Sequence, residues 1–203
     1  MVQNTAKEIT NEKSRGQAVT EFALAIPLIF SMVLGVLEFG VALAANIGVN
    51  RASQSAALMA SEAGNIIGAD CLILDEIERH VIPPASPSKI TGVRVERTSF
   101  RGDTVLADNR WARTGTTTCT VADKLTVDLP YTISLETYPD VQRCNSLGGC
   151  PSMTPARSTV DSIAVVVTYQ HDWVTPLGSL IPLFGGNSWD FEKRTVFRME
   201  PHS

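Results

Sequence analysis

The sequence lacks the features that would connect it to nucleic acid or to the common enzyme classes. Its 203 residues contain 17 lysines and arginines against 21 aspartates and glutamates, for a formal net charge of −4. A mildly acidic chain without a basic cluster gives no electrostatic reason to bind phosphate backbones. No G-x-S-x-G, H-E-x-x-H, P-loop or G-x-G-x-x-G motif occurs either. We therefore expect neither a nucleic-acid partner nor an enzyme.

Histidine is scarce, and no residues have the spacing of a metal site. The three histidines are scattered and there is no C-x-x-C pair, so we expect no metal and no other cofactor. His171 and Asp172 are adjacent, and adjacent strand residues point to opposite faces, so we interpret them as surface residues. Asp140 follows Pro139 and is interpreted as a turn residue. The three tryptophans are interpreted as core or interface anchors: Trp111, Trp173 and Trp189.

Charge is absent from one long apolar stretch near the N-terminus. Residues 22–37 contain no charged side chain, and apolar sequence resumes after Glu38 and continues to Ala45. Read as one helix, residues 22–45 would be about 36 Å long, which is enough to cross a hydrocarbon core of about 30 Å. The alternative is a secretory signal peptide cut near residues 42–45, although this apolar run is longer than such peptides need.

The flanks of this stretch predict its orientation and its ends. The polar residues 1–16 are expected to be unstructured and contain Lys7, Lys13 and Arg15, so the N-terminus should stay in the cytoplasm, with the chain from about Asn46 outside. Glu21 stands at the start of the apolar run and Glu38 inside it. A carboxylate deep in a bilayer costs about 2–3 kcal/mol and is usually functional. The two are about 25 Å apart along a helix, so both could instead lie at opposite membrane faces.

The sequence around Glu21 carries a recognisable motif. Arg15-Gly16-Gln17-Ala18-Val19-Thr20-Glu21-Phe22 places a glycine at the end of a short basic leader and a glutamate five residues later, at the junction with the apolar run. This arrangement resembles the processing site of type IV prepilins. With the following Ala-Leu-Ala-Ile-Pro-Leu and Gly35-Val-Leu-Glu-Phe-Gly40, the segment 15–64 resembles the TadE/TadF-type pseudopilins of the tight adherence (Flp) pilus.

The resemblance implies a pathway of processing and assembly. A prepilin peptidase would cut between Gly16 and Gln17, which makes Glu21 the fifth residue of the mature chain. The new α-amine of Gln17 is cationic at neutral pH, and in pilins the amine of one subunit faces the glutamate of its neighbour. Glu21 and Phe22 would then be assembly residues, and the partners would be the peptidase, other pilin subunits and the inner membrane. The alternative role for Glu21 is to stabilise the N-terminal end of the helix dipole.

Small residues continue beyond the apolar run at intervals of four. This spacing lets helices approach closely, and it also suits a helix that merely favours its own formation. The helix should reach about Ala63 and stop at Gly64, giving an N-terminal helix over 17–64. The helix-packing candidates within it are Gly40, Ala44, Gly48 and Ala52.

The remaining residues, 65–203, are enough for an extracytoplasmic domain with its own core. A short helix is expected from Asp70, its N-cap, to Val81. Five strands are expected from alternating or β-branched runs: 90–97, 125–129, 131–135, 163–169 and 195–199. These elements predict an α+β fold of the type IV pilin-like kind, a long helix packed on an antiparallel sheet.

Four cysteines lie in this exported portion, and an even count there favours two disulfides over free thiols. Cys144 and Cys150 bracket a short glycine-containing loop and are the favoured pair, which leaves Cys71 for Cys119. The leading hypothesis is a minor pseudopilin of the tight adherence pilus. Its main alternative is a single-pass, membrane-tethered binding module with no pilus role.

Overall fold

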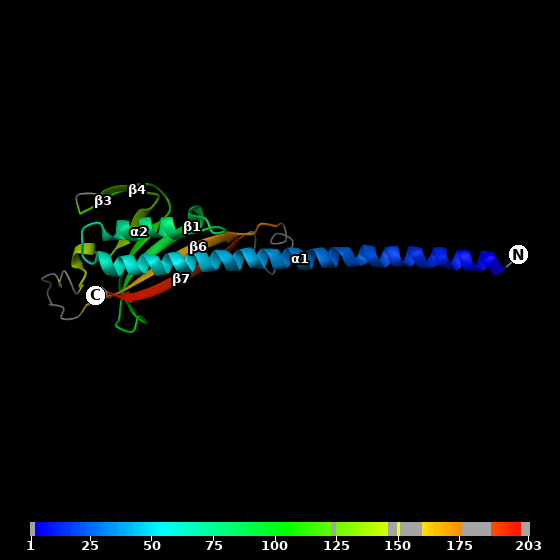
Figure 1. Ribbon diagram of the computed structural model, residues 1–203. Helices are drawn as coiled ribbons and strands as arrows, with labels where there is room; N and C mark the ends of the chain where they lie inside the picture. The colour runs from blue at the N-terminus through cyan, green and yellow to red at the C-terminus, as the bar shows by residue number, and fades with distance from the viewer. Residues whose placement is uncertain (1–2, 123–124, 146–149, 151–159, 176–187, 200–203) are drawn as a thin grey trace.

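The computed structural model describes residues 3–122, 125–145, 150, 160–175 and 188–199, with side chains described from Gly16 onward. It has the α+β architecture expected, a long N-terminal helix and an antiparallel sheet. Figure 1 shows the globular domain gathered around one end of that helix, whose other half projects away alone.

Helix α1 spans Gln3–Ala63 and passes through Pro27 without ending. The expectation that residues 1–16 are unstructured is wrong for residues 3–16, which belong to the helix. Residues 3–15 contain no proline or glycine that would break it. At the other end, α1 stops where predicted. Gly64 has φ +61°, and a β-carbon there would lie 2.3 Å from the side-chain nitrogen of Asn145. Glycine is favoured here for two reasons: the backbone is left-handed, and there is no room for a side chain.

Helix α2, Ala69–His80, folds back along α1. Its N-cap is Gly68, so the assignment of Asp70 as the cap is wrong. Asp70 instead lies in the first turn, buried, and its carboxylate is turned toward the sheet. The apolar side chains of Ile73, Leu74 and Ile77 are fully buried against α1 and the sheet.

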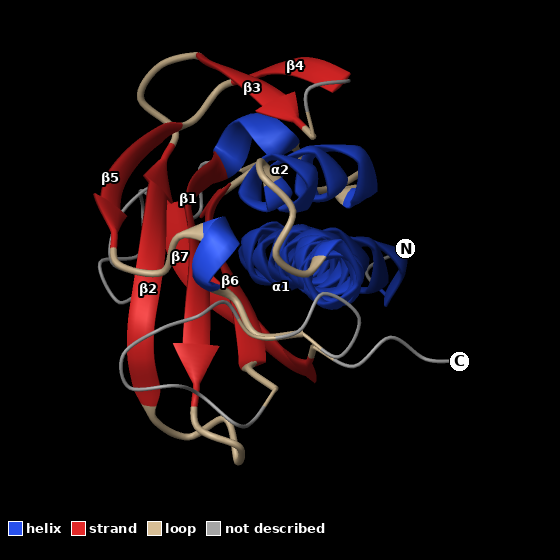
Figure 2. Ribbon diagram, turned by 90° about the vertical axis from the view of Figure 1, so that its left-hand side faces the viewer, coloured by secondary structure: helices blue, strands red, loops and turns tan. Residues whose placement is uncertain are grey.

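The main sheet has five antiparallel strands in the order β5-β2-β1-β6-β7. Their bounds are Ile90–Thr98 (β1), Val105–Ala112 (β2), Thr132–Glu136 (β5), Ser162–Asp172 (β6) and Ser188–Arg198 (β7). Both helices cover the same face of this sheet (Figure 2). Short 3₁₀ turns at Pro87–Lys89 and Asp140–Gln142 connect elements around it.

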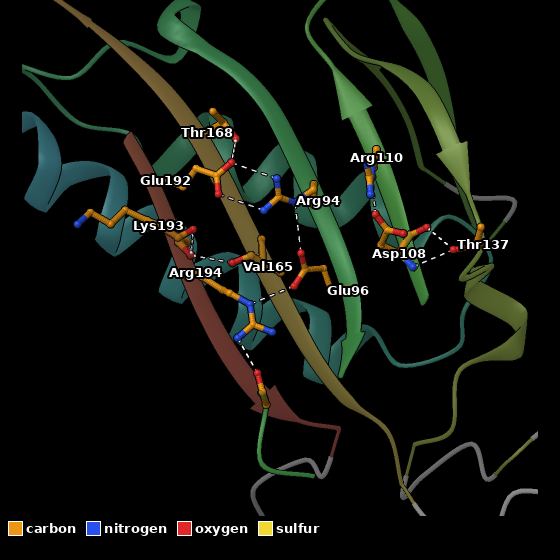
Figure 3. Close-up of polar contacts among 12 residues, drawn as sticks. Arg94, Glu96, Asp108, Arg110, Thr137, Val165, Thr168, Glu192, Lys193 and Arg194 are labelled. Atoms are coloured by element: carbon orange, nitrogen blue, oxygen red, sulfur yellow. Dashed lines mark hydrogen bonds and ion pairs between the residues drawn. The ribbon is translucent and has the colours of Figure 1, made fainter. Parts of the chain in front are cut away.

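The opposite face of the sheet is closed by its own charged side chains. Arg94 on β1 makes two parallel hydrogen bonds to Glu192 on β7, of 3.0 and 3.1 Å, and Arg194 on β7 donates to Glu96 on β1 at 3.0 Å (Figure 3). Val166 lies between the two arginines in the strand register and is only 1% exposed. Long arginine side chains cover apolar surface in this way, so this part of the face needs no further element.

A second, two-stranded sheet lies on the far side of α2. It consists of β3, Thr117–Val121, and β4, Leu125–Leu129, which pair antiparallel. Cys119 on β3 forms a disulfide with Cys71 on α2. An isolated hairpin is marginally stable in water, and this disulfide together with the buried side chains of Val121 and Leu129 holds it to the helix.

Candidate functional site: the N-terminal helix

The part of α1 from Gly16 to Leu37 is largely apolar and uncovered. Every side chain from Gly16 to Leu37 is exposed except Ala25 and Leu34, which are half-buried. Among the described residues, the stretch 16–63 contains the one helix long and apolar enough to cross a membrane. Phenylalanine, leucine and valine side chains that are 64–79% exposed, such as Phe22, Leu24 and Val36, would be costly to leave in water. A lipid environment removes that cost.

The motif residues lie at the start of this uncovered segment. Gly16, Gln17, Glu21 and Phe22 are all exposed on α1, and a β-carbon added at Gly16 would meet nothing within 4 Å. The side-chain amide of Gln17 donates to the carboxylate of Glu21 at 2.9 Å, one helical turn away. Within the described part of the chain Glu21 makes no other hydrogen bond or ion pair, so its exposed carboxylate is available to a group outside the molecule.

Glu38 lies in a different environment. It is 5% exposed, and one of its carboxylate oxygens accepts a hydrogen bond of 3.1 Å from the backbone N–H of Thr175, just beyond β6. Its other oxygen is buried and has no hydrogen-bond partner among the residues that the structure describes. From Glu38 onward the domain covers one face of α1, beginning with Ala42 at 1% exposed and Ala45 at 0%. Glu38 thus marks the level at which the uncovered helix ends.

The four helix-packing candidates divide into two pairs. Ala52 is fully buried, and Gly48 lies against the domain, where an added β-carbon would sit 3.2 Å from the carbonyl oxygen of Ile82. Gly40 and Ala44 are exposed, and a β-carbon at Gly40 would meet nothing within 4 Å. Gly48 and Ala52 therefore pack within the chain, and Gly40 and Ala44 remain accessible to another molecule.

Residues 16–58 match the family model of the TadE-like proteins. No curated protein and no solved structure matches the chain. The TadE-like segment begins at Gly16 and includes the uncovered residues 16–37 of α1 together with most of its covered part, residues 38–58. The chain therefore carries a TadE-like segment, and that segment coincides with the one described helix that is long and apolar enough to cross a membrane.

Outside the TadE-like segment, the structure contains a buried ionic cluster that the sequence did not reveal. The guanidinium of Arg143 is fully buried and contacts the carboxylates of both Asp70 and Asp140, the latter at 2.9 Å. Asp140 also accepts a 3.0 Å hydrogen bond from the backbone N–H of Gly68. It is therefore more than a turn residue. Burial and the nearby Asp70 raise the pKa of Asp140 to about 6, against the opposing effect of Arg143.

This cluster holds the far end of the domain together. It joins the start of α2 to the turn that leads into the second disulfide, Cys144–Cys150. Both disulfides have the pairing that the spacing favoured, although residues 146–149 of the enclosed loop lie outside the described part of the chain. Asn109 on β2 connects a third segment to the cluster, because its amide donates to Asp70 at 2.8 Å.

The remaining residues singled out in the sequence divide between core and rim. His171 is buried, at 5% exposed, and Asp172 is exposed, so the two do point to opposite faces, but the placement of His171 on the surface is wrong. Trp111 is buried and donates to Asp70, whereas Trp189 is 44% exposed. Among the described residues, no group of three His, Cys, Asp or Glu side chains is placed to hold a metal ion.

Proposed function

We propose that this protein is a minor pseudopilin, a structural and assembly component of a tight adherence (Flp) pilus that a prepilin peptidase processes after Gly16. The observation that carries the proposal is the register of three features. A TadE-like match begins at residue 16, Glu21 lies five residues later on an exposed surface, and the uncharged apolar run of α1 begins at the next residue, Phe22.

The length of the uncovered helix supports this register. Cleavage after Gly16 would leave Gln17–Leu37 as the part of α1 below the domain, which is 21 residues and about 32 Å of helix. A hydrocarbon core is about 30 Å thick. We therefore propose a membrane segment over 17–37, which is shorter than 22–45, because one face of residues 38–45 is already covered by the domain.

The same register gives Glu21 a chemical role in assembly. Its carboxylate would enter the membrane region with only the neutral amide of Gln17 beside it, and an unpaired carboxylate in low dielectric is costly. The α-amine that cleavage creates on a neighbouring subunit offers an opposite charge. We infer that this pairing fixes where one subunit stops along the next, while Phe22 and the exposed pair Gly40 and Ala44 supply the helix contacts.

The orientation follows from the flanking charges. Lys7, Lys13 and Arg15 precede the membrane segment, and basic residues next to a first membrane helix stay in the cytoplasm. The leader 1–16 would then face the cytoplasm from the bacterial inner membrane, and the disulfide-containing domain would lie outside, where oxidising conditions let disulfides persist.

The decisive experiment is the N-terminal residue of the protein purified from its native membrane, measured by intact mass and N-terminal peptide mapping. A mature chain that starts at Gln17 supports prepilin processing and a pilus role. A chain that keeps residues 1–16 refutes it and favours the membrane-tethered binding module. A start near Ala45 would mean that an ordinary signal peptidase removes the whole apolar segment.

A further inference from the structure

The end of the domain nearest to the uncovered helix carries exposed apolar side chains. Trp189, the second residue of β7, is 44% exposed, and Val174, which follows β6, is 70% exposed. The strand register pairs Trp189 with His171, and Thr175 binds Glu38, so both apolar residues belong to the end of the sheet that meets α1 where its cover ends. Water-exposed tryptophan and valine at this position call for an explanation.

The level of Trp189 along α1 follows from a shared reference point. The hydroxyl of Ser53 on α1 lies 3.0 Å from that of Thr195 on β7. From there, β7 extends six residues to Trp189, about 20 Å of strand. In the same direction α1 extends fifteen residues to Glu38, about 22 Å of helix. The two elements run side by side in Figure 1, so Trp189 lies close to the level of Glu38.

This level is where a bilayer presents its headgroups. If the membrane segment ends at Leu37, the headgroup layer occupies roughly the next 5–7 Å on the domain side. Tryptophan is enriched in that layer because its apolar ring enters the lipid while its N–H remains hydrogen-bonded. The stacking of aromatic rings supports the placement. Trp189 packs beside Phe191 at 5.8 Å between ring centroids, and Phe191 packs beside the buried Tyr169 at 5.2 Å, so a row of rings runs from the core to this rim.

Charge does not oppose contact with lipid at this end. The described residues at this end, 173–175 after β6 and 188–189 at the start of β7, are all uncharged. At the end of β6, Asp172 is paired with the ammonium group of Lys89. The side chain of Asp190 follows Trp189 on the strand and therefore points to the opposite face.

We propose that this rim, formed by Trp189 and Val174, is a second membrane-contacting surface that rests in the lipid headgroup layer beside the helix. The partner is the bilayer itself. The proposal rests on the membrane segment 17–37. It adds a second contact with the bilayer, and two contacts fix the tilt of the domain relative to the membrane, whereas a single helix does not. In an assembled fibre the same rim would leave the lipid, so it distinguishes the membrane-resident subunit from the assembled one.

The test is quenching of tryptophan fluorescence by lipid. The full-length protein is reconstituted in phosphatidylcholine–phosphatidylglycerol vesicles, with or without phosphatidylcholine brominated on the acyl carbons close to the headgroup. The wild type is compared with Trp189→Phe, a mild change at an exposed position. The difference between the two isolates the emission of Trp189, and we expect the brominated lipid to remove most of it. Phe100→Trp is the matched control, because Phe100 is 78% exposed just beyond β1, at the opposite end of the sheet. Its added emission should survive.

Flotation of the vesicles separates this proposal from the one on which it depends. Protein that floats with the vesicles, while the Trp189 emission is unquenched, overturns the second contact and leaves the membrane segment intact. Protein that does not float overturns both. Emission from Trp189 that is blue-shifted equally in detergent and in vesicles, and insensitive to bromine, means that a protein neighbour covers the ring, which also overturns the proposal.

Discussion

Removal of each disulfide in turn should show that the Cys71–Cys119 bond contributes more stability than the Cys144–Cys150 bond. The first closes 48 residues and the second 6. In the loop-entropy description, closing loops of these lengths lowers the entropy of the unfolded chain by amounts worth about 4 and about 2 kcal/mol at 25 °C. Cys71→Ala/Cys119→Ala should therefore cost about 2 kcal/mol more than Cys144→Ala/Cys150→Ala.

The assay is urea unfolding of the full chain in detergent, followed by tryptophan fluorescence for the wild type and both double variants. The two variants each replace two cysteines by alanine, so the comparison controls for side-chain loss. Hydrogen exchange gives a local readout, because Cys71–Cys119 fastens the β3–β4 hairpin to α2. Equal losses of stability in the two variants, or unchanged protection of the hairpin amides when Cys119 is replaced, would refute the reasoning.

Four further outcomes are expected. Glu21→Ala should leave the mature N-terminus at Gln17 while pilus output falls, as measured by mass spectrometry and by counting pili; normal output would contradict the assembly role. Gly68→Ala should destabilise the domain by about 2 kcal/mol or more, because Gly68 has φ +82° and a β-carbon would lie 2.5 Å from the carbonyl oxygen of Thr120. Gly40→Ala, on an open surface of the helix, should instead stabilise the protein by up to about 1 kcal/mol. If urea unfolding shows Gly40→Ala to be less stable than Gly68→Ala, both statements are contradicted. Finally, the raised pKa of Asp140, about 6, means that the folded chain binds a proton more tightly than the unfolded chain. Its stabilising contribution is complete below the unfolded value near 4 and is lost as pH rises through about 6, so the wild type should lose about 1–3 kcal/mol between pH 4 and pH 7.5 relative to Asp140→Asn. An identical pH dependence of the two proteins would contradict this.

The elements that the sequence predicted are those with a repeating apolar pattern. The length and lack of charge of residues 22–37 predicted a long helix, and the run of β-branched residues from Ile163 to Tyr169 predicted what became the central part of β6. Gly64 was correctly assigned as the end of α1. In each case the burial of one face or of the whole segment leaves a periodic signal that is visible without the structure.

Two strands and the ionic cluster were not predicted, because none of them leaves a periodic apolar pattern in the sequence. The strand β2 has Asn109 on its buried face, where a satisfied amide replaces an apolar side chain, so the alternation is interrupted. The strand β3 has three threonines among its five residues and so contains no apolar run that would predict it. Asp70, Asp140 and Arg143 are brought together across as many as 73 residues, and no local pattern indicates which distant partner satisfies a buried charge. Only the long-range contact makes burial of these groups tolerable.

The covered face of α1 is built almost entirely from small side chains. The packing of such a surface does little to fix the position of the helix along the sheet. A smooth row of alanines could slide along the sheet by one helical turn, about 5.4 Å, and meet similar neighbours. Two polar contacts prevent this. Ser53 donates to the carbonyl of Val165 at 3.1 Å, and Glu38 accepts from Thr175 at 3.1 Å. A slip of one turn would break both hydrogen bonds and leave the buried carboxylate of Glu38 without a donor. The two contacts therefore fix the register of α1 on the sheet, and with it the length of helix that projects from the domain.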